Sequence, residues 1–344
     1  MLKKLKIILF SAAIILGINI LYTSSAKASD VNGLAMQPVY PSNQIVKNGI
    51  LNPRVKPGTK QNLSFNIINL SNQDEKITVQ PNTAITSGGP AIDYSHNKYN
   101  YDKSLKYNFG QIFSPKKLDL TVKSNKPTKV TFTANIPKKK FKGLLMGGFY
   151  ITTSQISYNT NSSTSLNNKY TYAMPVIMRE DNVKSVPKLS LGDVTNGNSF
   201  KTPIITSSIS NKEPAMIDRM SLDTTIKDPN SNTILHKKSD NNSVAPNSNF
   251  KYVTPIDNKD NLDPGKYHIK IIAKSPEGKW ILEKDFTVTV GQYLGTIIQN
   301  NQWIWLILAL IILLIISLIG YLIYRKRRRN NQSNNAQTRV ERNK

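Results

Sequence analysis

Two apolar segments, one toward each end of the chain, most restrict how the rest of the sequence can fold. The first covers residues 7–22 and follows Lys3, Lys4 and Lys6, and a stretch of small residues after it ends at Ala28. A basic start, an apolar run and a small-residue site are typical of a secretory signal peptide. We therefore predict a signal peptide over residues 1–28, cleaved after Ala28.

The second apolar segment, residues 303–324, has no charged residue and is long enough to cross a bilayer core of about 30 Å. Trp303 and Trp305 stand at its start, and such amphipathic rings favour the membrane interface. No LPxTG-type cleavage motif precedes it, so we expect it to remain as a single-pass anchor. By the positive-inside rule, the basic cluster after it places the tail, residues 325–344, in the cytoplasm and the ectodomain outside. The cluster consists of Arg325, Lys326, Arg327, Arg328 and Arg329.

The region between these segments is basic and has no cysteine, which excludes disulfides, thiolate metal sites and a cysteine nucleophile. Residues 29–181 hold 19 Lys and Arg against 8 Asp and Glu, whereas residues 182–302 hold 15 against 12. Basic surfaces attract polyanions. An exported region of this size without cysteine suits a bacterial envelope, and a single membrane anchor favours a Gram-positive one. The polyanions outside such a membrane are teichoic acids and the carboxylates of peptidoglycan, and nucleic acid is not an expected partner. The alternative is that the lysines only keep the surface soluble.

Short runs of alternating apolar and polar residues, separated by turn residues, fill the exported region and predict β-strands. Examples are residues 63–67, 130–136, 172–178 and 267–273, and we find no sustained helical stripe before residue 300. One sandwich of roughly 100 residues cannot hold this region. We predict an all-β fold of two tandem immunoglobulin-like β-sandwiches, residues 29–181 and 182–291. A juxtamembrane linker, residues 292–302, and a transmembrane helix, residues 303–324, then follow.

Three local features refine this prediction. Tyr267 follows a Pro264-Gly265 turn, and we interpret it as a core or corner residue. The polar segment 154–169 is interpreted as the loop of a hairpin that ends the first sandwich. The twelve residues 291–302 span at most about 40 Å when extended. The second sandwich must therefore stay near the membrane, and we expect the first to be stacked above it as a rod.

No catalytic, cofactor or metal motif is visible in the sequence. His96, His236 and His268 lie far apart and lack metal-ligand spacing, and we expect surface positions for them. Nucleophile elbows, phosphate loops and dinucleotide fingerprints are absent. Asp93, Asp102 and Asp119 could in principle form a glycosidase pair, but nothing in the sequence brings two of these carboxylates together. We predict a non-catalytic protein without cofactor or metal.

Two segments of the basic half are candidate binding sites. In the first, four lysines surround one aromatic residue before a Gly-Gly strand: Lys138, Lys139, Lys140, Phe141 and Lys142. This cluster is our candidate for wall contact, and the alternative is a solvated basic loop. In the second, tyrosines are mixed with lysines: Tyr94, Tyr99, Tyr101 and Tyr107 with Lys98, Lys103 and Lys106. Such tyrosines suit stacking on sugars or a protein partner, although packing in the core is the alternative.

A series of motifs in order resembles a known family. The first half carries NPRVKPG (52–58), NIINLSN (66–72), IDY (92–94), YDKSL (101–105) and IPKKKFKGLLMGGFY (136–150). The second half carries APNSNF (245–250), LDPGKY (262–267) and KW (279–280). With the signal peptide, anchor and basic tail, this series resembles the WxL-interacting proteins of Gram-positive bacteria. The resemblance implies a cell-surface adhesion protein that engages WxL-domain surface proteins. It also implies that the first domain binds peptidoglycan and the second binds the host surface, and it supplies no catalytic residues.

Two other functions remain open at this point. An assembly chaperone for surface proteins would pair an exposed strand edge with an extended segment of its client. A membrane-bound cell-wall hydrolase would need a catalytic site that the sequence does not show.

Overall fold

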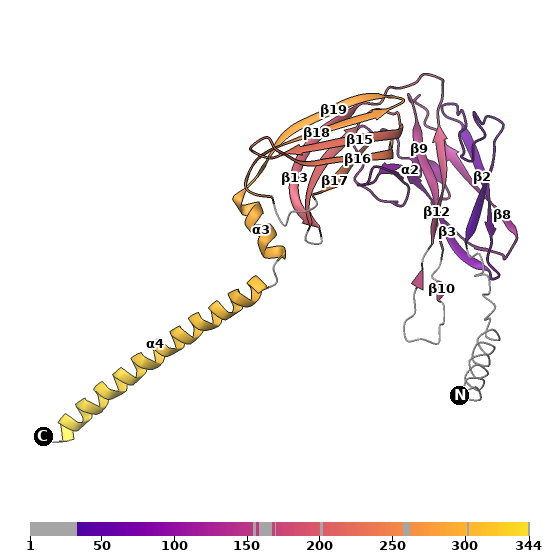
Figure 1. The fold of residues 1–344 in the computed structure, drawn as a ribbon. Coiled ribbons are helices and arrows are strands. Elements are labelled where there is room, and N and C mark those ends of the chain that lie inside the picture. The colour runs from indigo at the N-terminus through magenta and orange to yellow at the C-terminus, as the bar shows by residue number, and fades with distance from the viewer. Residues whose placement is uncertain are drawn as a thin grey trace, which may run out of the picture.

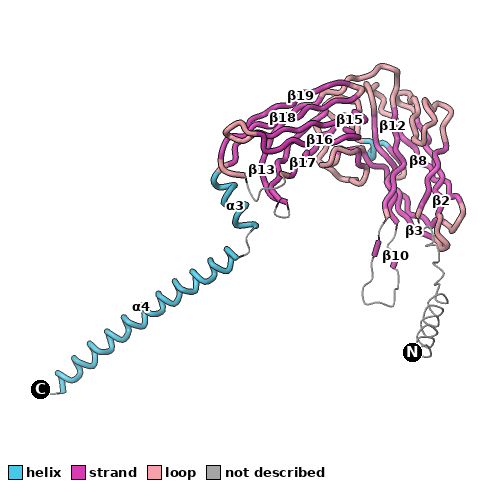
Figure 2. Tube along the Cα trace, in the orientation of Figure 1, coloured by secondary structure: helices cyan, strands magenta, loops and turns pink. Residues whose placement is uncertain are grey.

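The computed structural model describes residues 33–153, 156–157, 167–168, 170–199, 202–256, 262–300 and 303–342. Two β-domains are followed by two helices in the chain, and Figures 1 and 2 show how they are arranged. The predicted all-β class with a C-terminal helix is confirmed. The predicted signal peptide and its cleavage after Ala28 lie outside the described residues.

The first domain is a sandwich of two antiparallel four-stranded sheets. One sheet has the order β1 (Leu34–Val39), β2 (Lys60–Asn69), β8 (Pro127–Asn135) and β6 (Phe113–Ser114). The other has the order β12 (Thr171–Met178), β9 (Leu145–Thr153), β3 (Glu75–Thr83) and β7 (Leu118–Val122). Smaller elements are β4 (Ile85–Thr86), β5 (Ile92–Asp93), β10 (Ile156–Ser157), β11 (Asn167–Asn168) and the short helix α2 (Phe109–Ile112).

Alternation along these strands builds an aromatic core between the two sheets. Phe149 of β9 stacks on Phe65 of β2 and on Phe132 of β8, with ring centroids 5.3 and 4.7 Å apart. Strands β9 and β12 pair in antiparallel register, so the predicted hairpin at the end of this domain is confirmed. Most of its predicted loop, residues 154–169, lies outside the described residues.

The second domain packs a three-stranded sheet on a four-stranded one. The first has the order β13 (Leu189–Ser199), β14 (Thr202–Asn211) and β17 (Ser248–Pro255). The second has the order β16 (Thr233–Val244), β15 (Ile217–Lys227), β18 (Gly265–Ser275) and β19 (Gly278–Val288). Tyr267 is buried, stacks on Phe286 with ring centroids 5.5 Å apart, and donates a hydrogen bond of 2.9 Å to the Asp263 carbonyl oxygen. The interpretation of Tyr267 as a core or corner residue is confirmed.

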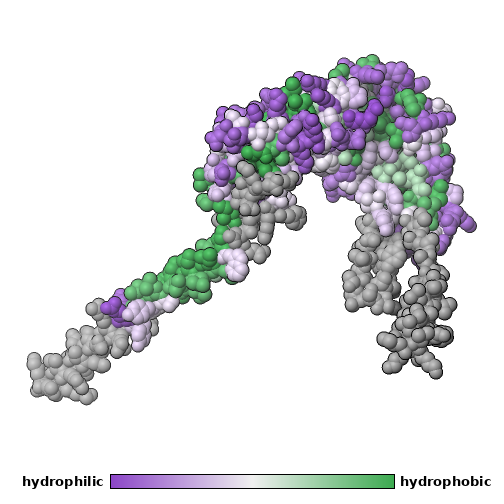
Figure 3. Space-filling view, viewed as in Figure 1, coloured by the Kyte–Doolittle hydropathy of each residue, from purple (hydrophilic) through white to green (hydrophobic). Residues whose placement is uncertain are grey.

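Two helices follow the second domain, α3 (Val290–Asn300) and α4 (Trp303–Arg342). In α4, Trp303–Lys326 contains an 18-residue window with a mean hydropathy of 3.2 and no buried residue, so the segment is long and apolar enough to cross a membrane. Figure 3 shows this apolar stretch as a continuous green rod. The expectation that no helical stripe precedes residue 300 was wrong, because α3 occupies the predicted linker. At 1.5 Å per residue α3 spans only about 16 Å, well short of the extended limit.

The two domains form an elbow, so the rod-like stacking expected from sequence was also wrong. In Figure 1 the strands of the first domain run upright while those of the second run across them. The bend has a physical cause, because the contacts between the domains come from one corner of each. The corner of the first domain holds the β4–β5 hairpin with its flanking loops and the β8–β9 loop, and the corner of the second holds the β14–β15 and β16–β17 turns.

Candidate binding surface at the domain junction

A small apolar cluster joins the two domains. Its buried members are Ala84, Met146 and Ile177 of the first domain and Ala245 of the second, and Tyr94 and Met216 pack against it partly buried. This cluster is separate from the core of each domain. The junction therefore has a hydrophobic centre of its own, which favours a fixed angle between the domains over free hinge motion.

Buried hydrogen bonds surround this cluster. Thr86 Oγ1 lies 2.7 Å from Ser248 Oγ and accepts a hydrogen bond of 3.0 Å from the Ala245 N–H. Both hydroxyl-bearing residues are almost fully buried. The Ser243 N–H also donates to the Pro90 carbonyl oxygen, at 2.9 Å. Since a buried polar group left without a partner is costly, these bonds fix the register between the domains.

The lysine loop, residues 138–142, lies beside this junction. Lys138, Lys139, Lys140 and Lys142 are exposed, as a surface site requires. Phe141 is only 8% exposed and packs edge-on against Tyr107, with ring centroids 6.4 Å apart. Its predicted role as a contact residue is therefore corrected. As the only apolar residue of the loop, Phe141 enters the first core and holds the lysines outward.

Acidic residues after β12 hold the backbone of the lysine loop. The Phe141 N–H donates to Glu180 Oε2 at 3.2 Å, and Lys140 Nζ forms an ion pair with Asp181 Oδ2 at 2.9 Å. The hydrogen bond to Asp181 raises the pKa of Lys140, and the same bond lowers the pKa of Asp181. Burial raises the pKa of Glu180. Lys140 is thus engaged within the protein, whereas Lys138, Lys139 and Lys142 present their charge to solvent.

The end of the loop touches the second domain directly. The Leu144 N–H donates to the Pro214 carbonyl oxygen at 2.7 Å. Gly143 adopts a φ of +69°, and a Cβ there would lie 2.2 Å from the same oxygen. Only glycine allows this close approach. Gly143, directly after the lysine loop, therefore holds the loop against the second domain at the junction.

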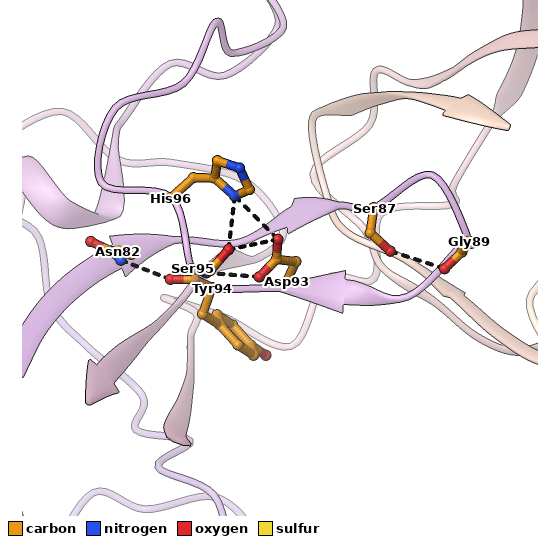
Figure 4. A network of polar contacts seen from close by, with 7 residues as sticks. All are labelled: Asn82, Ser87, Gly89, Asp93, Tyr94, Ser95 and His96. Carbon is orange, nitrogen blue, oxygen red and sulfur yellow. Dashed lines mark hydrogen bonds and ion pairs between the residues drawn. The ribbon is translucent and has the colours of Figure 1, made fainter. Parts of the chain in front are cut away.

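The tyrosine segment, residues 94–107, divides into packed and exposed members. Tyr94 packs against the junction cluster, and burial raises its pKa far above the usual value. In Figure 4 its ring points away from the neighbouring polar network, in which Ser95 and His96 converge on the Asp93 carboxylate. Tyr94 therefore packs inside the protein, as the alternative interpretation predicted.

Tyr99 is the exposed tyrosine of this segment, and Tyr101 beside it is partly buried. Tyr99 is 36% exposed, and its ring centroid lies 5.6 Å from that of Tyr101 and 5.4 Å from that of His96. Tyr107 is partly buried against the first core. Its hydroxyl donates to the Lys139 carbonyl oxygen at 3.3 Å. Tyr107 therefore connects the tyrosine segment to the lysine loop.

The tyrosine segment also reaches the second domain. Asn247 Nδ2 donates to the Ser104 carbonyl oxygen at 3.3 Å, and Asn249 Nδ2 lies 3.5 Å from Asp102 Oδ2. Burial opposes ionisation of Asp102, but hydrogen bonds from Ser104 and the charge of Lys212 outweigh it and lower the pKa of Asp102. The structure thus brings both predicted segments to one junction. Sequence reasoning missed Asn247 and its neighbours as junction residues, although the 245–250 motif marked the position.

The other residues considered for chemistry are dispersed over the surface. His236 pairs with Asp223 and His268 with Asp285, at 2.8 and 2.7 Å. Asp119 accepts from Thr78 in an open groove of about 510 Å³ over β3, β7 and β9, away from the junction. Within the described ranges, no group of three or more His, Cys, Asp or Glu could hold a metal ion.

Two family models match the chain. The WxL Interacting Protein peptidoglycan binding domain matches residues 35–153, and the WxL Interacting Protein host binding domain matches residues 161–293. The chain belongs to the WxL-interacting protein family. Both descriptions are of binding domains rather than of catalytic families. The second match starts before β12, yet β12 pairs with β9 and completes the first sandwich of this WxL-interacting protein.

Comparison with known proteins adds little beyond the family. No curated protein matches the chain. The SafA pilin with the SafB chaperone of Salmonella enterica is 12% identical, covering 76% of this chain and 99% of that one, with a TM-score of 0.28. The E. coli chaperone DraB is 12% identical, covering 75% and 98%, with a TM-score of 0.27. Scores this low carry no argument about function.

Proposed function

We propose that this protein is a non-catalytic, membrane-anchored scaffold of the Gram-positive cell surface. In this proposal the first domain binds peptidoglycan and teichoic acid, and the protein engages WxL-domain surface proteins. The second domain contributes to attachment to host surfaces. The observation that carries the proposal is the order of the two family domains, followed by an exposed apolar helix.

The proposed orientation places both domains outside the cell and the C-terminal tail in the cytoplasm. Its support is the basic cluster that begins at Arg325 and Lys326, directly after the apolar stretch of α4. Trp303 and Trp305, which are 71% and 63% exposed, stand at the other end of the stretch. There they would anchor the helix at the outer interface.

The lysine loop is the proposed wall contact. Lys138, Lys139 and Lys142 are exposed, and the loop backbone is held by Phe141 in the core and by Glu180. A surface that is already ordered loses less entropy when it binds. Three neighbouring positive charges on such a loop suit the phosphates of teichoic acid and the carboxylates of peptidoglycan peptides. Tyr99 offers an exposed ring for stacking on sugars, with the partly buried Tyr101 beside it.

The wall contact is tested by charge removal with a matched control. Changing Lys138, Lys139 and Lys142 to Gln should release the ectodomain from isolated Gram-positive walls at lower salt than the wild type. The control changes three other exposed lysines of the same domain, Lys47, Lys126 and Lys129, and so removes the same charge. Both variants should melt as the wild type does, because exposed substitutions usually change stability by less than about 0.5 kcal/mol. Equal retention of the two variants would mean that net charge alone binds the wall.

The protein partner is tested in intact cells. Crosslinking followed by mass identification should recover a WxL-domain surface protein with the full-length chain. Recovery of host proteins alone, or of lipid-modified enzymes alone, would contradict the proposal. Incubation of the ectodomain with isolated walls distinguishes the hydrolase alternative, since a hydrolase would release soluble wall fragments whereas a binding protein would not.

A further inference from the structure

Helix α3 has its own start signal, independent of any contact with the rest of the protein. Thr289 Oγ1 accepts from the Gln292 N–H at 3.2 Å, while Gln292 Oε1 accepts from the Thr289 N–H at 2.9 Å. This reciprocal pair is a capping box, which satisfies N–H groups at the first turn of a helix. The local sequence therefore specifies the start of a helix at this point. A flexible linker would need no capping box.

The sequence of α3 gives the helix one apolar face. At about 100° per residue, four apolar residues share one side: Val290, Tyr293, Leu294 and Ile297. Gln292 lies on the opposite side, and the backbone position of residue 299 is about 180° around the helix from that of Val290. No residue of α3 is charged. Val290 and Leu294 are 60% and 51% exposed, whereas Tyr293 and Ile297 are partly buried and α3 touches β13, so the protein leaves part of the apolar face uncovered.

The position of α3 in the chain identifies what covers this face. Only residues 301 and 302 separate α3 from the apolar stretch that begins at Trp303. In the view of Figure 1, α3 runs across the line of α4 rather than continuing it. Figure 3 shows apolar surface at α3 close to the start of the apolar part of α4. If α4 crosses a membrane, α3 must lie at the outer surface of that membrane.

We infer that α3 is an interfacial helix that lies on the outer leaflet, with its apolar face in the lipid. This inference rests on the proposed membrane anchoring by α4. A short uncharged helix has little membrane affinity of its own, but the anchor holds it at the surface, so insertion is effectively intramolecular. Two successive lipid-bound elements then hold the second domain against the membrane. They limit how far the two domains together can rotate relative to the membrane plane.

Single-cysteine labelling of the full-length protein tests the inference, because the chain contains no cysteine of its own. Leu294→Cys places an environment-sensitive fluorophore on the apolar face, and Gln299→Cys places it on the opposite side. Leu310→Cys within the apolar stretch of α4 reports on the anchor. Each labelled protein is reconstituted in vesicles of phosphatidylglycerol and phosphatidylcholine and is quenched separately with iodide and with doxyl-labelled lipid.

We expect the probe at residue 294 to emit at shorter wavelength, to be quenched by doxyl lipid and to be protected from iodide. The probe at residue 299 should behave in the opposite way. Iodide quenching at both positions, with lipid quenching at residue 310, would overturn the inference while leaving the anchor intact. Protection of residue 294 from both quenchers would show that its face packs on protein instead. Failure of lipid to quench residue 310 would overturn the anchor and the inference together.

Discussion

Gly143→Ala tests whether the junction fixes the angle between the two domains. An added Cβ would lie 2.2 Å from the Pro214 carbonyl oxygen, whereas ordinary contacts begin at 3.4 Å. The backbone must therefore move by about 1 Å, which breaks the 2.7 Å hydrogen bond from the Leu144 N–H. Losing that bond costs about 1 kcal/mol. The left-handed φ of +69° adds roughly 1–2 kcal/mol for alanine.

Gly58→Ala is the matched control for this change. Gly58 has a φ of +70°, and its added Cβ would meet only Lys138, with Cγ at 3.7 Å and Cα at 3.9 Å, which are ordinary contact distances. The difference between the two variants therefore isolates the junction, at about 1 kcal/mol or more. In thermal unfolding of the ectodomain this corresponds to a further fall in Tm of about 2–4 °C. Small-angle scattering should show a changed interdomain shape for Gly143→Ala alone. Equal Tm values and superimposable scattering curves would refute the reasoning.

Three further changes test other parts of the structure. Thr86→Val leaves the buried Ala245 N–H without its acceptor and should lower the free energy of unfolding by about 1–3 kcal/mol in urea titration; an unchanged value would mean the junction bonds do not stabilise the protein. The pKa of Asp102 is lowered below its usual value of 3.8 in the folded protein, so its ionised carboxylate stabilises the fold at pH values above 3.8. This stabilisation is lost as the pH falls from 3.8 through the folded-state pKa. Asp102→Asn should therefore reduce the loss of Tm between pH 7 and pH 3. Gly147→Ala puts a Cβ 2.2 Å from the Phe109 ring and should cost about 1–3 kcal/mol or more, measured by thermal unfolding; a wild-type Tm would contradict this packing.

The sequence predicted the strands of both domains because their signal is local. Alternation over residues 63–67 and 130–136 marks the buried faces of β2 and β8, and the structure buries those apolar side chains. The apolar stretch from Trp303 is equally local, since length and composition decide it. Helix α3 was readable in the same way from Thr289 and Gln292. The linker prediction fails because these eleven residues follow a long run of strands and carry no charge, so composition alone does not distinguish a helix from an extended segment.

The accessibility of individual side chains in the candidate site depends on contacts between distant parts of the chain. Among five consecutive residues with four lysines, the apolar character of Phe141 favours burial, but the sequence does not show which side chains would receive its ring. That outcome depends on Tyr107, which is 34 positions earlier in the chain. The sequence therefore indicated the composition of the lysine loop but not the contacts that decide which of its residues are accessible.

The sequence by itself determined two β-sandwich domains, a basic first domain and an apolar segment followed by a basic cluster. Each of these follows from periodicity or composition within a short window. Only the tertiary structure decided the elbow, the junction cluster and the meeting of the lysine loop with the tyrosine segment. Thr86 and Ser248 are 162 positions apart, and no local preference of either residue encodes their contact. Such contacts arise when two finished surfaces fit together, so their register depends on the folded shape of both domains.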